Sequence, residues 1–282
     1  MRLSARLTVV AIAFSSAAFA PAIPSSSNIP IDPNDQGDSG EFDGDSSSIL
    51  PDDTVEPEPW ERFEQGSVTQ PTQGRIEQAI GFYANGSLIN ASALPDQGDG
   101  FVKLFRSRNR PWGTDDILSL FQWTAAEMQK RFPGGERLQV GDIANKKGGS
   151  TGGHDSHQNG LDMDIVYFRV NHKEILDTST FAESFVSHGK VTANFDTARN
   201  WETLKLLVSS KWVNRVFMDQ AIKKEFCRYA KSIGESLRET ETLRRMRPWP
   251  NHDDHFHLRI KCPPKSPRCK TQDEPPTGSG CS

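Results

Sequence analysis

The sequence predicts an α+β fold, a single domain with a central, mainly antiparallel sheet flanked by helices. Two observations lead to this prediction. Segments that alternate apolar and polar residues, as strands do, are mixed with segments of helical periodicity. These segments do not follow the regular strand–helix–strand order of a parallel α/β sheet. Hydrophobic residues make up 35% of the 282 residues, which is enough for one core.

The first 66 residues lack the composition of a folded domain. Basic residues precede an apolar stretch that ends in Ala20-Pro21-Ala22, a pattern typical of a cleaved secretory signal peptide over residues 1–22. Residues 23–66 are rich in Pro, Gly, Ser and Asp, which indicates a disordered acidic linker. The folded domain is therefore expected over residues 67–282. No apolar run is long enough for a membrane span, and the weakly basic body does not indicate nucleic-acid binding.

The elements of the domain follow in order along the chain. A helix should begin after Thr114, where two acidic residues favour a helix start, and end before Pro133-Gly134-Gly135. The Gly-rich loop 147–153 lacks phosphate-binding spacing. Alternation and β-branched or aromatic content predict strands over residues 137–143, 161–170 and 255–261, and helical periodicity predicts helices over residues 199–209, 218–231 and 234–246.

Five of the seven histidines fall into two short clusters, which are the main functional signal of the sequence. The first cluster contains His154 and His157, and the second contains His252, His255 and His257. Each cluster adjoins a predicted strand. A lone His-x-His pair usually faces solvent, so it is the conjunction of the two clusters that favours a metal site over a solvated surface.

Strand geometry predicts which of these side chains meet. Asp162 and Asp164 share the face opposite Met163 and Ile165, and His255 and His257 share the face opposite Phe256. Neighbouring strands would place His257 beside Asp164, and a turn at Gly160 would return His157 to the same point. Two imidazoles and one carboxylate form a three-ligand zinc site that leaves the fourth position open, as catalysis requires.

The four cysteines become informative once export is predicted, since an oxidising compartment favours disulfides. Three pairings of Cys227, Cys262, Cys269 and Cys281 are possible. The short Cys262–Cys269 loop could close on itself, which would leave Cys227 with Cys281. A cysteine-only zinc site is disfavoured because the spacings do not suit one.

The string GGHDSHQNGLDMDI (152–165) resembles the signature of the penicillin-insensitive murein endopeptidases, members of the superfamily of lysostaphin-like enzymes, D-Ala-D-Ala metallopeptidases and the hedgehog fold. Further similar segments follow in order from about residue 75 to residue 282, including Arg247-Pro248-Trp249 and HDDHFHLRIKC (252–262). Departures are Ser87, where relatives often carry a further cysteine, and Lys146, Lys147 and Ser150, where they often carry an arginine.

The resemblance implies roles for the clustered residues. His157, Asp164 and His257 match zinc ligands, and His154 matches a further histidine near the metal. His255 and His252 match the other active-site histidines. We expect His255 to be the general base or oxyanion stabiliser because it shares the strand face of His257, with His252 second. The resemblance also implies disulfides Cys262–Cys269 and Cys227–Cys281.

The resemblance further implies zinc-dependent hydrolysis of D-alanyl–diaminopimelyl cross-links in peptidoglycan by a periplasmic or secreted enzyme. The alternatives are a D-Ala-D-Ala carboxypeptidase or dipeptidase of the same superfamily and a non-catalytic wall-binding protein. One catalytic Zn²⁺ is expected. A second metal at a subunit interface has no evident ligand set, and a homodimer is compatible with the sequence.

Overall fold

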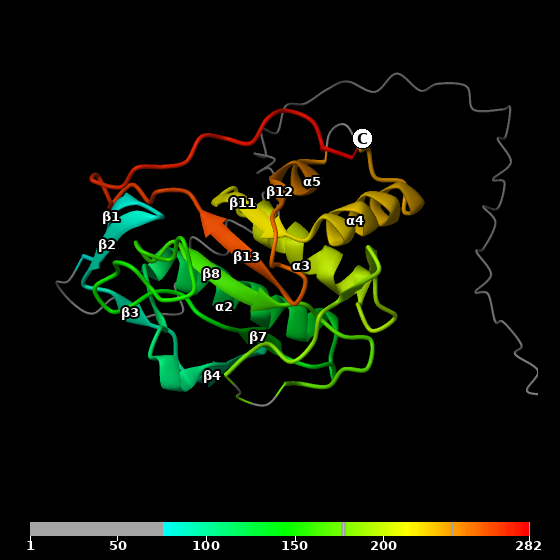
Figure 1. The fold of residues 1–282 in the computed structure, drawn as a ribbon, viewed down its shortest axis with the longest axis horizontal. Helices are drawn as coiled ribbons and strands as arrows, with labels where there is room; N and C mark the ends of the chain where they lie inside the picture. Colours follow the sequence, from blue (N-terminus) through cyan, green and yellow to red (C-terminus); the bar gives the residue numbers. More distant parts are fainter. Residues whose placement is uncertain (1–75, 176, 178, 238–239, 282) are drawn as a thin grey trace, which may run out of the picture. The chain divides into compact units, whose positions relative to one another are not determined.

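The computed structural model describes residues 76–175, 177, 179–237 and 240–281, and its centre is a seven-stranded mixed sheet (Figure 1). Four of its six pairings are antiparallel, while β12–β11 and β5–β7 are parallel. The α+β class and the mainly antiparallel sheet are therefore confirmed. In spatial order the strands are β12 (Met246–Pro248), β11 (Val213–Met218), β13 (His255–Ile260), β8 (Asp162–Val166), β7 (Leu138–Val140), β5 (Phe101–Lys103) and β4 (Gln97–Gly98).

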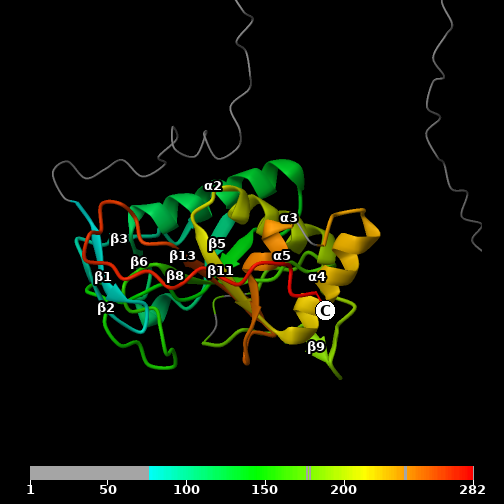
Figure 2. The same cartoon turned by 90° about the horizontal axis from the view of Figure 1, so that it is seen from above.

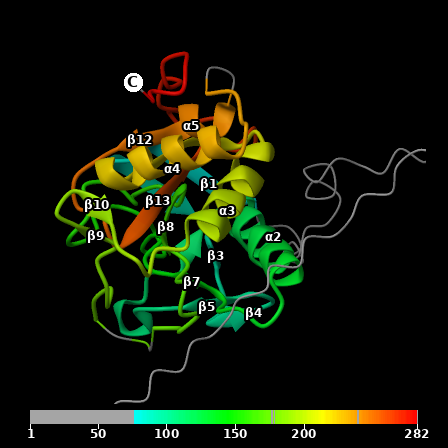
Figure 3. The same cartoon turned by 90° about the vertical axis from the view of Figure 1, so that its right-hand side faces the viewer.

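Helices cover one face of this sheet, as Figure 2 shows for α2 and α3. Figure 3 shows α3 between α2 and α4, and α3 contacts both of these helices. Among the described residues, none of the helices combines the length and the apolar composition that a membrane crossing needs. The helices are α2 (Asp115–Arg131), α3 (Thr197–Ser209), α4 (Gln220–Ser232) and the short α5 (Glu241–Arg245), with a 3₁₀ turn η1 (Arg106–Arg108).

Three two-stranded sheets accompany the central one. The antiparallel pair β1–β2 lies near the C-terminal end of β13 in Figure 1 and is tied to the C-terminal segment by a bridge between Gly81 and Cys269. The pairs are β1 (Gln78–Phe82) with β2 (Asn85–Ile89), β3 (Ser92–Ala93) with β6 (Trp112–Gly113), and β9 (Val186–Ser187) with β10 (Lys190–Val191).

The sequence predicted helices α2, α3 and α4 and strands β7, β8 and β13, but not the other strands, and one of its helices is wrong. The helix after Thr114 runs to Arg131, and the strands predicted over 137–143, 161–170 and 255–261 are present in shortened form. The helix predicted over residues 234–246 is wrong, because of the described residues in that range only Glu241–Arg245 form a helix. Gly234, with φ +82°, follows the end of α4, and Met246 pairs with Val216 in the sheet. The expected leader 1–22 and linker 23–66 lie outside the described residues.

The two central strands, β8 and β13, are buried on both faces. On the helix side, Met163, Ile165 and Phe256 join the hydrophobic core. On the other side the buried residues are polar, and Asp162 and Asp164 are at most 1% exposed. Burying carboxylates costs free energy unless they are paired. This polar face therefore needs charged partners, and the strands supply them.

Candidate metal and catalytic site

The register of β8 and β13 places the two predicted ligands opposite each other. His257 pairs with Asp164 across the antiparallel ladder, and Arg259 pairs with Asp162. Residues directly opposite on one face have Cβ atoms about 5 Å apart. The strand alternation thus brings an imidazole and a carboxylate together on the buried polar face, as the sequence predicted.

Asp164 is the centre of a ring of four imidazoles. His157 Nε2 lies 3.2 Å from Asp164 Oδ1, and the His255 Nε2 and His257 Nδ1 atoms each lie 3.6 Å from the same oxygen. His154 Nδ1 lies 3.7 Å from the other oxygen, Oδ2. All the histidines of both clusters gather here, since His252 also lies with its ring centroid 5.0 Å from that of His255.

A turn of left-handed residues delivers His157. His157 has φ +64° and Gly160 has φ +73°. A Cβ at Gly160 would lie 2.6 Å from Leu88 Cδ2, so only glycine fits there without a shift of its neighbour. The His157 N–H donates to Asp162 Oδ2 at 3.0 Å, and its Nδ1 lies 2.7 Å from the Ile143 carbonyl oxygen. A carbonyl can only accept, so Nδ1 carries a proton and Nε2 is the ring nitrogen that faces Asp164.

His257 is oriented by Asp162 in the opposite sense. Its Nε2 lies 3.0 Å from Asp162 Oδ1, which favours the proton on Nε2 and leaves Nδ1 directed at Asp164. Asp162 itself is neutralised by Arg259, which donates Nε to Oδ1 at 2.7 Å and Nη2 to Oδ2 at 3.1 Å. Asp162 therefore positions both ring systems and is not available as a ligand.

His154 approaches from the rim of the site. Its Nε2 lies 3.1 Å from Asp142 Oδ2, an oxygen that also accepts from Arg108 and Arg110. The His154 side chain is 20% exposed, against 1% for His157. His154 thus belongs to a charged network at the opening, with Nδ1 on the Asp164 side.

His255 has the surroundings of a proton-handling group. Its Nδ1 lies 2.5 Å from Asp254 Oδ1, and Phe181 stacks on the ring at a centroid distance of 4.5 Å. Burial alone would lower the pKa of His255, but the carboxylates of Asp164 and Asp254 raise it above its ordinary value. Burial lowers the pKa of His252. Of the two histidines that the sequence proposes as proton-handling groups, His255 therefore favours the protonated form and His252 the neutral form.

The buried charges favour an ionised carboxylate at the centre. Burial opposes ionisation of Asp164, but the His157 and His255 imidazoles hold its pKa well below the usual range. Burial likewise opposes charging of His157, yet Asp164 raises the pKa of that imidazole to about 9. Burial lowers the pKa of His257 to about 4. The centre therefore holds an ionised Asp164, a His157 imidazole that favours the protonated form and a His257 imidazole that favours the neutral form.

The donor atoms fit a metal cation. Among the described residues, His157 Nε2 and Asp164 Oδ1 are buried and have no hydrogen-bond partner, although such atoms rarely go unsatisfied. Ligand atoms of His154, His157 and Asp164 all lie within 4.8 Å of one another. Imidazole nitrogen with one carboxylate oxygen is a typical donor set for zinc. His257 Nδ1 faces the same carboxylate and completes the set of candidate ligands.

Three residues of the site were not assigned a role from the sequence. Asp142 follows β7, within the part of the chain that resembles the family, but in no motif that marks it as a site residue. Asp254 precedes β13, and its contact with His255 is between chain neighbours, a signal the sequence offered. Phe181 comes from a segment with no periodic pattern, and only the fold brings it to His255.

The comparisons with known proteins agree with this geometry. The sequence matches the penicillin-insensitive murein endopeptidase family over residues 79–282. The penicillin-insensitive murein endopeptidase of Klebsiella pneumoniae subsp. pneumoniae is 31% identical over 229 residues, 79% of this chain and 78% of the relative. That of Salmonella typhi is 34% identical over 230 residues, again 79% of this chain and 78% of the relative. These matches identify the chain as a peptidase. Within that class, the chain belongs to the penicillin-insensitive murein endopeptidase family.

Proposed function

We propose that this protein is a zinc-dependent endopeptidase that hydrolyses D-alanyl–diaminopimelyl cross-links in peptidoglycan. The observation that carries the proposal is the buried centre at Asp164, where His157 and His257 direct ring nitrogens at one carboxylate. Membership of the murein endopeptidase family supports the substrate class. The proposed bond joins D-amino acids, so ordinary proteases should not compete for it.

The proposed ligands are His157, Asp164 and His257, with His154 at the edge of the set. Zinc, when bound, lowers the pKa of water to about 7 and polarises a carbonyl group. The Ile143 carbonyl orients the His157 ring and Asp162 orients the His257 ring, so neither imidazole has to rotate when the ion binds.

His255 is proposed to handle the proton in hydrolysis. Asp254 holds its Nδ1, so Nε2 points toward the centre, where it can accept or donate a proton or stabilise a developing oxyanion. His252, with its pKa lowered by burial, is the second proposed proton acceptor. We assign the general base to a histidine because the carboxylates of the described site have other partners. Asp164 is a proposed ligand, Asp162 is paired with Arg259, Asp142 accepts from Arg108 and Arg110, and Asp254 contacts His255.

The two disulfides of the structure support export, since such bonds persist in oxidising compartments. We therefore propose a periplasmic location with peptidoglycan as the partner.

The test uses purified, cross-linked dimeric muropeptides and the full chain. We expect release of monomers, loss of that activity with a chelator and its recovery with added zinc. A protein that instead trims terminal D-alanine from monomers would be a carboxypeptidase. Binding to sacculi without any product would identify a wall-binding protein. Recovery with another divalent ion but not with zinc would contradict the zinc assignment.

A further inference from the structure

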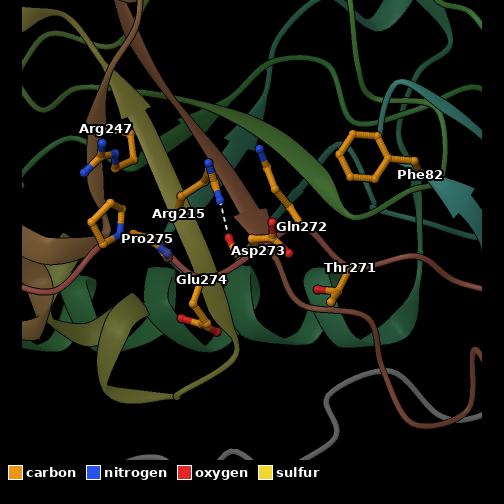
Figure 4. A pocket seen from close by; sticks show the side chains of 9 residues that line it. Phe82, Arg215, Arg247, Thr271, Gln272, Asp273, Glu274 and Pro275 are labelled. Atoms are coloured by element: carbon orange, nitrogen blue, oxygen red, sulfur yellow. Dashed lines mark hydrogen bonds between the residues drawn. The ribbon is translucent and has the colours of Figure 1, made fainter.

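A basic cavity lies on the same sheet face as the proposed metal centre. It has a volume of about 460 Å³ and is lined by Arg215 of β11, Arg247 of β12 and the C-terminal segment from Thr271 to Pro276 (Figure 4). None of the proposed ligands or proton-handling histidines lines it. The cavity is therefore a feature separate from the proposed metal centre.

The sheet register connects the cavity with the centre. Arg247 pairs with Phe217 on β11, Phe217 pairs with His257 on β13, and His257 pairs with Asp164 on β8. These four residues form one row on one face. Since neighbouring strands are about 4.8 Å apart, the Arg247 backbone lies roughly 10 Å from that of His257. That span is about three residues of extended peptide.

The arginines of the cavity lack carboxylate partners. Among the described residues, the Arg247 guanidinium has neither a hydrogen bond nor an ion pair. Arg215 donates only to neutral oxygens, to Asn214 Oδ1 at 2.7 Å and to the Asp273 carbonyl at 2.5 Å. Burial, together with the charges of Arg259 and Arg247, lowers the pKa of Arg215, as expected of crowded cations.

The acidic residues of the lining form no ion pair with Arg215 or Arg247 among the described residues, although the charge of Glu274 partly opposes the lowering of the Arg215 pKa. Glu274 is engaged elsewhere, with Arg245 and with Lys261. Asp273 is exposed, and the group it offers Arg215 is its main-chain carbonyl. The cavity thus presents two guanidinium groups that have no ion pair with a carboxylate in the part of the chain that the structure describes. Guanidinium groups bind carboxylates with paired N–H donors.

We propose that Arg247 and Arg215 form a subsite for a free carboxylate of the murein stem peptide, remote from the bond that is cut. Murein stems are acidic, because glutamyl and diaminopimelyl residues keep carboxylates that take no part in linkage. This inference rests on the proposed function and adds to it a specificity determinant. The exposed ring of Trp249 packs edge-on against Phe217, which stands between Arg247 and His257 in the row, with the ring centroids 5.9 Å apart.

The experiment compares two matched substrates, dimeric muropeptides with free stem carboxylates and the same dimers with those carboxylates amidated. A hydrogen bond to a charged group contributes about 1.5–3 kcal/mol, so amidation should raise the wild-type KM roughly 10- to 100-fold with little change in kcat. Arg247→Gln should raise KM for the acidic dimer to the same extent and leave the amidated dimer unaffected. Arg247→Lys should restore part of the preference.

Lys190→Gln, which removes one exposed charge outside the cavity, is the matched control and should behave as the wild type. Equal zinc content and melting temperature of Arg247→Gln and wild type establish that the variant is folded. Wild type that cleaves both dimers equally well, or Arg247→Gln that keeps the wild-type preference, would overturn the subsite while leaving the proposed function intact. Wild type that cleaves neither dimer overturns the proposed function and the subsite with it.

Discussion

At the scale of single residues, two carboxylates on one strand face have different roles. Asp162 and Asp164 are two positions apart and equally buried. Asp162 faces Arg259 across the ladder and is neutralised by it, whereas Asp164 faces His257 and keeps an oxygen without a hydrogen-bond partner among the described residues. The difference comes from the partner strand. The alternation of β8 alone could place both carboxylates on the polar face but could not separate their roles.

The two histidines of β13 should respond differently to removal. His257→Ala deletes one proposed ligand, and the remaining donors form a poor site, so we expect little bound zinc and no activity. His255→Ala deletes a proposed proton-handling group, so we expect near-stoichiometric zinc and a rate lower by roughly 10²–10⁴-fold. Elemental analysis of zinc per chain, combined with muropeptide release, measures both.

A matched control for the pair is His188→Ala, a histidine of the β9–β10 turn that is outside the ring around Asp164. It should retain both zinc and activity. Loss of zinc from His255→Ala with retention in His257→Ala would reverse the two roles. His154→Ala adds a graded comparison, because a rim residue should weaken zinc binding less than His257 does.

At the scale of elements, prediction succeeded where periodicity was strong. The alternation of β8 and β13 specified both the core face and the polar face, and the pairing of His257 with Asp164 followed from it. The segment 234–246 carries helical periodicity, but its last residue, Met246, begins strand β12 and pairs with β11. Tertiary contacts here outweigh local propensity. Asp142 and Phe181 lie in loops, whose residues follow no hydrophobic periodicity, so the sequence could not predict that they reach the site.

One buried acid between α2 and β7 should give the folded state a measurable pH dependence. Burial raises the pKa of Glu136 to about 7, although the Arg169 backbone N–H and Arg199 oppose that rise. The folded chain then keeps the proton that the unfolded chain releases near its ordinary pKa. The contribution is fully present below about pH 4.5 and is lost as the pH rises to about 7, with a size on the order of 2–3 kcal/mol.

Urea unfolding at several pH values from 4.5 to 8 measures this contribution. Glu136→Gln keeps an oxygen that can accept from the Arg169 N–H but does not titrate, so the difference in unfolding free energy between wild type and variant should change with pH over that range. Other groups titrate equally in both proteins and cancel. A difference that is constant from pH 4.5 to 8 would contradict the assignment.

At the scale of the whole molecule, two disulfides hold the C-terminal segment that lines the basic cavity. Cys262–Cys269 closes a loop of separation 7, and Cys227–Cys281 connects α4 to the chain end over a separation of 54. The pairing agrees with the one that the sequence resemblance implied. Longer loops lose more entropy on closure, so the second bridge should stabilise the fold more.

Paired serine replacements should reveal this order. Cys262→Ser with Cys269→Ser should lower the free energy of unfolding by about 2–3 kcal/mol, and Cys227→Ser with Cys281→Ser by about 4 kcal/mol. Neither pair contains a proposed ligand, so zinc content and low-temperature activity should persist in both variants. Denaturant unfolding gives the two values. A larger loss from the short loop would mean that native-state packing around Cys262 outweighs loop entropy.

The last prediction concerns the acidic segment that precedes the described domain. Residues 32–64 contain 12 acidic residues, and every proposed ligand and proton-handling histidine lies beyond residue 150. Deleting residues 23–66 should therefore leave zinc content and kcat/KM on soluble muropeptide dimers unchanged. On intact sacculi, the deletion should strengthen binding at low salt, because the acids no longer repel an anionic wall or shield the basic body. That difference should vanish at about 1 M salt, where the Debye length falls to about 3 Å. A truncated chain that fails to fold or to bind zinc would show that the segment belongs to the domain, and a salt-independent change in sacculus binding would exclude the electrostatic role.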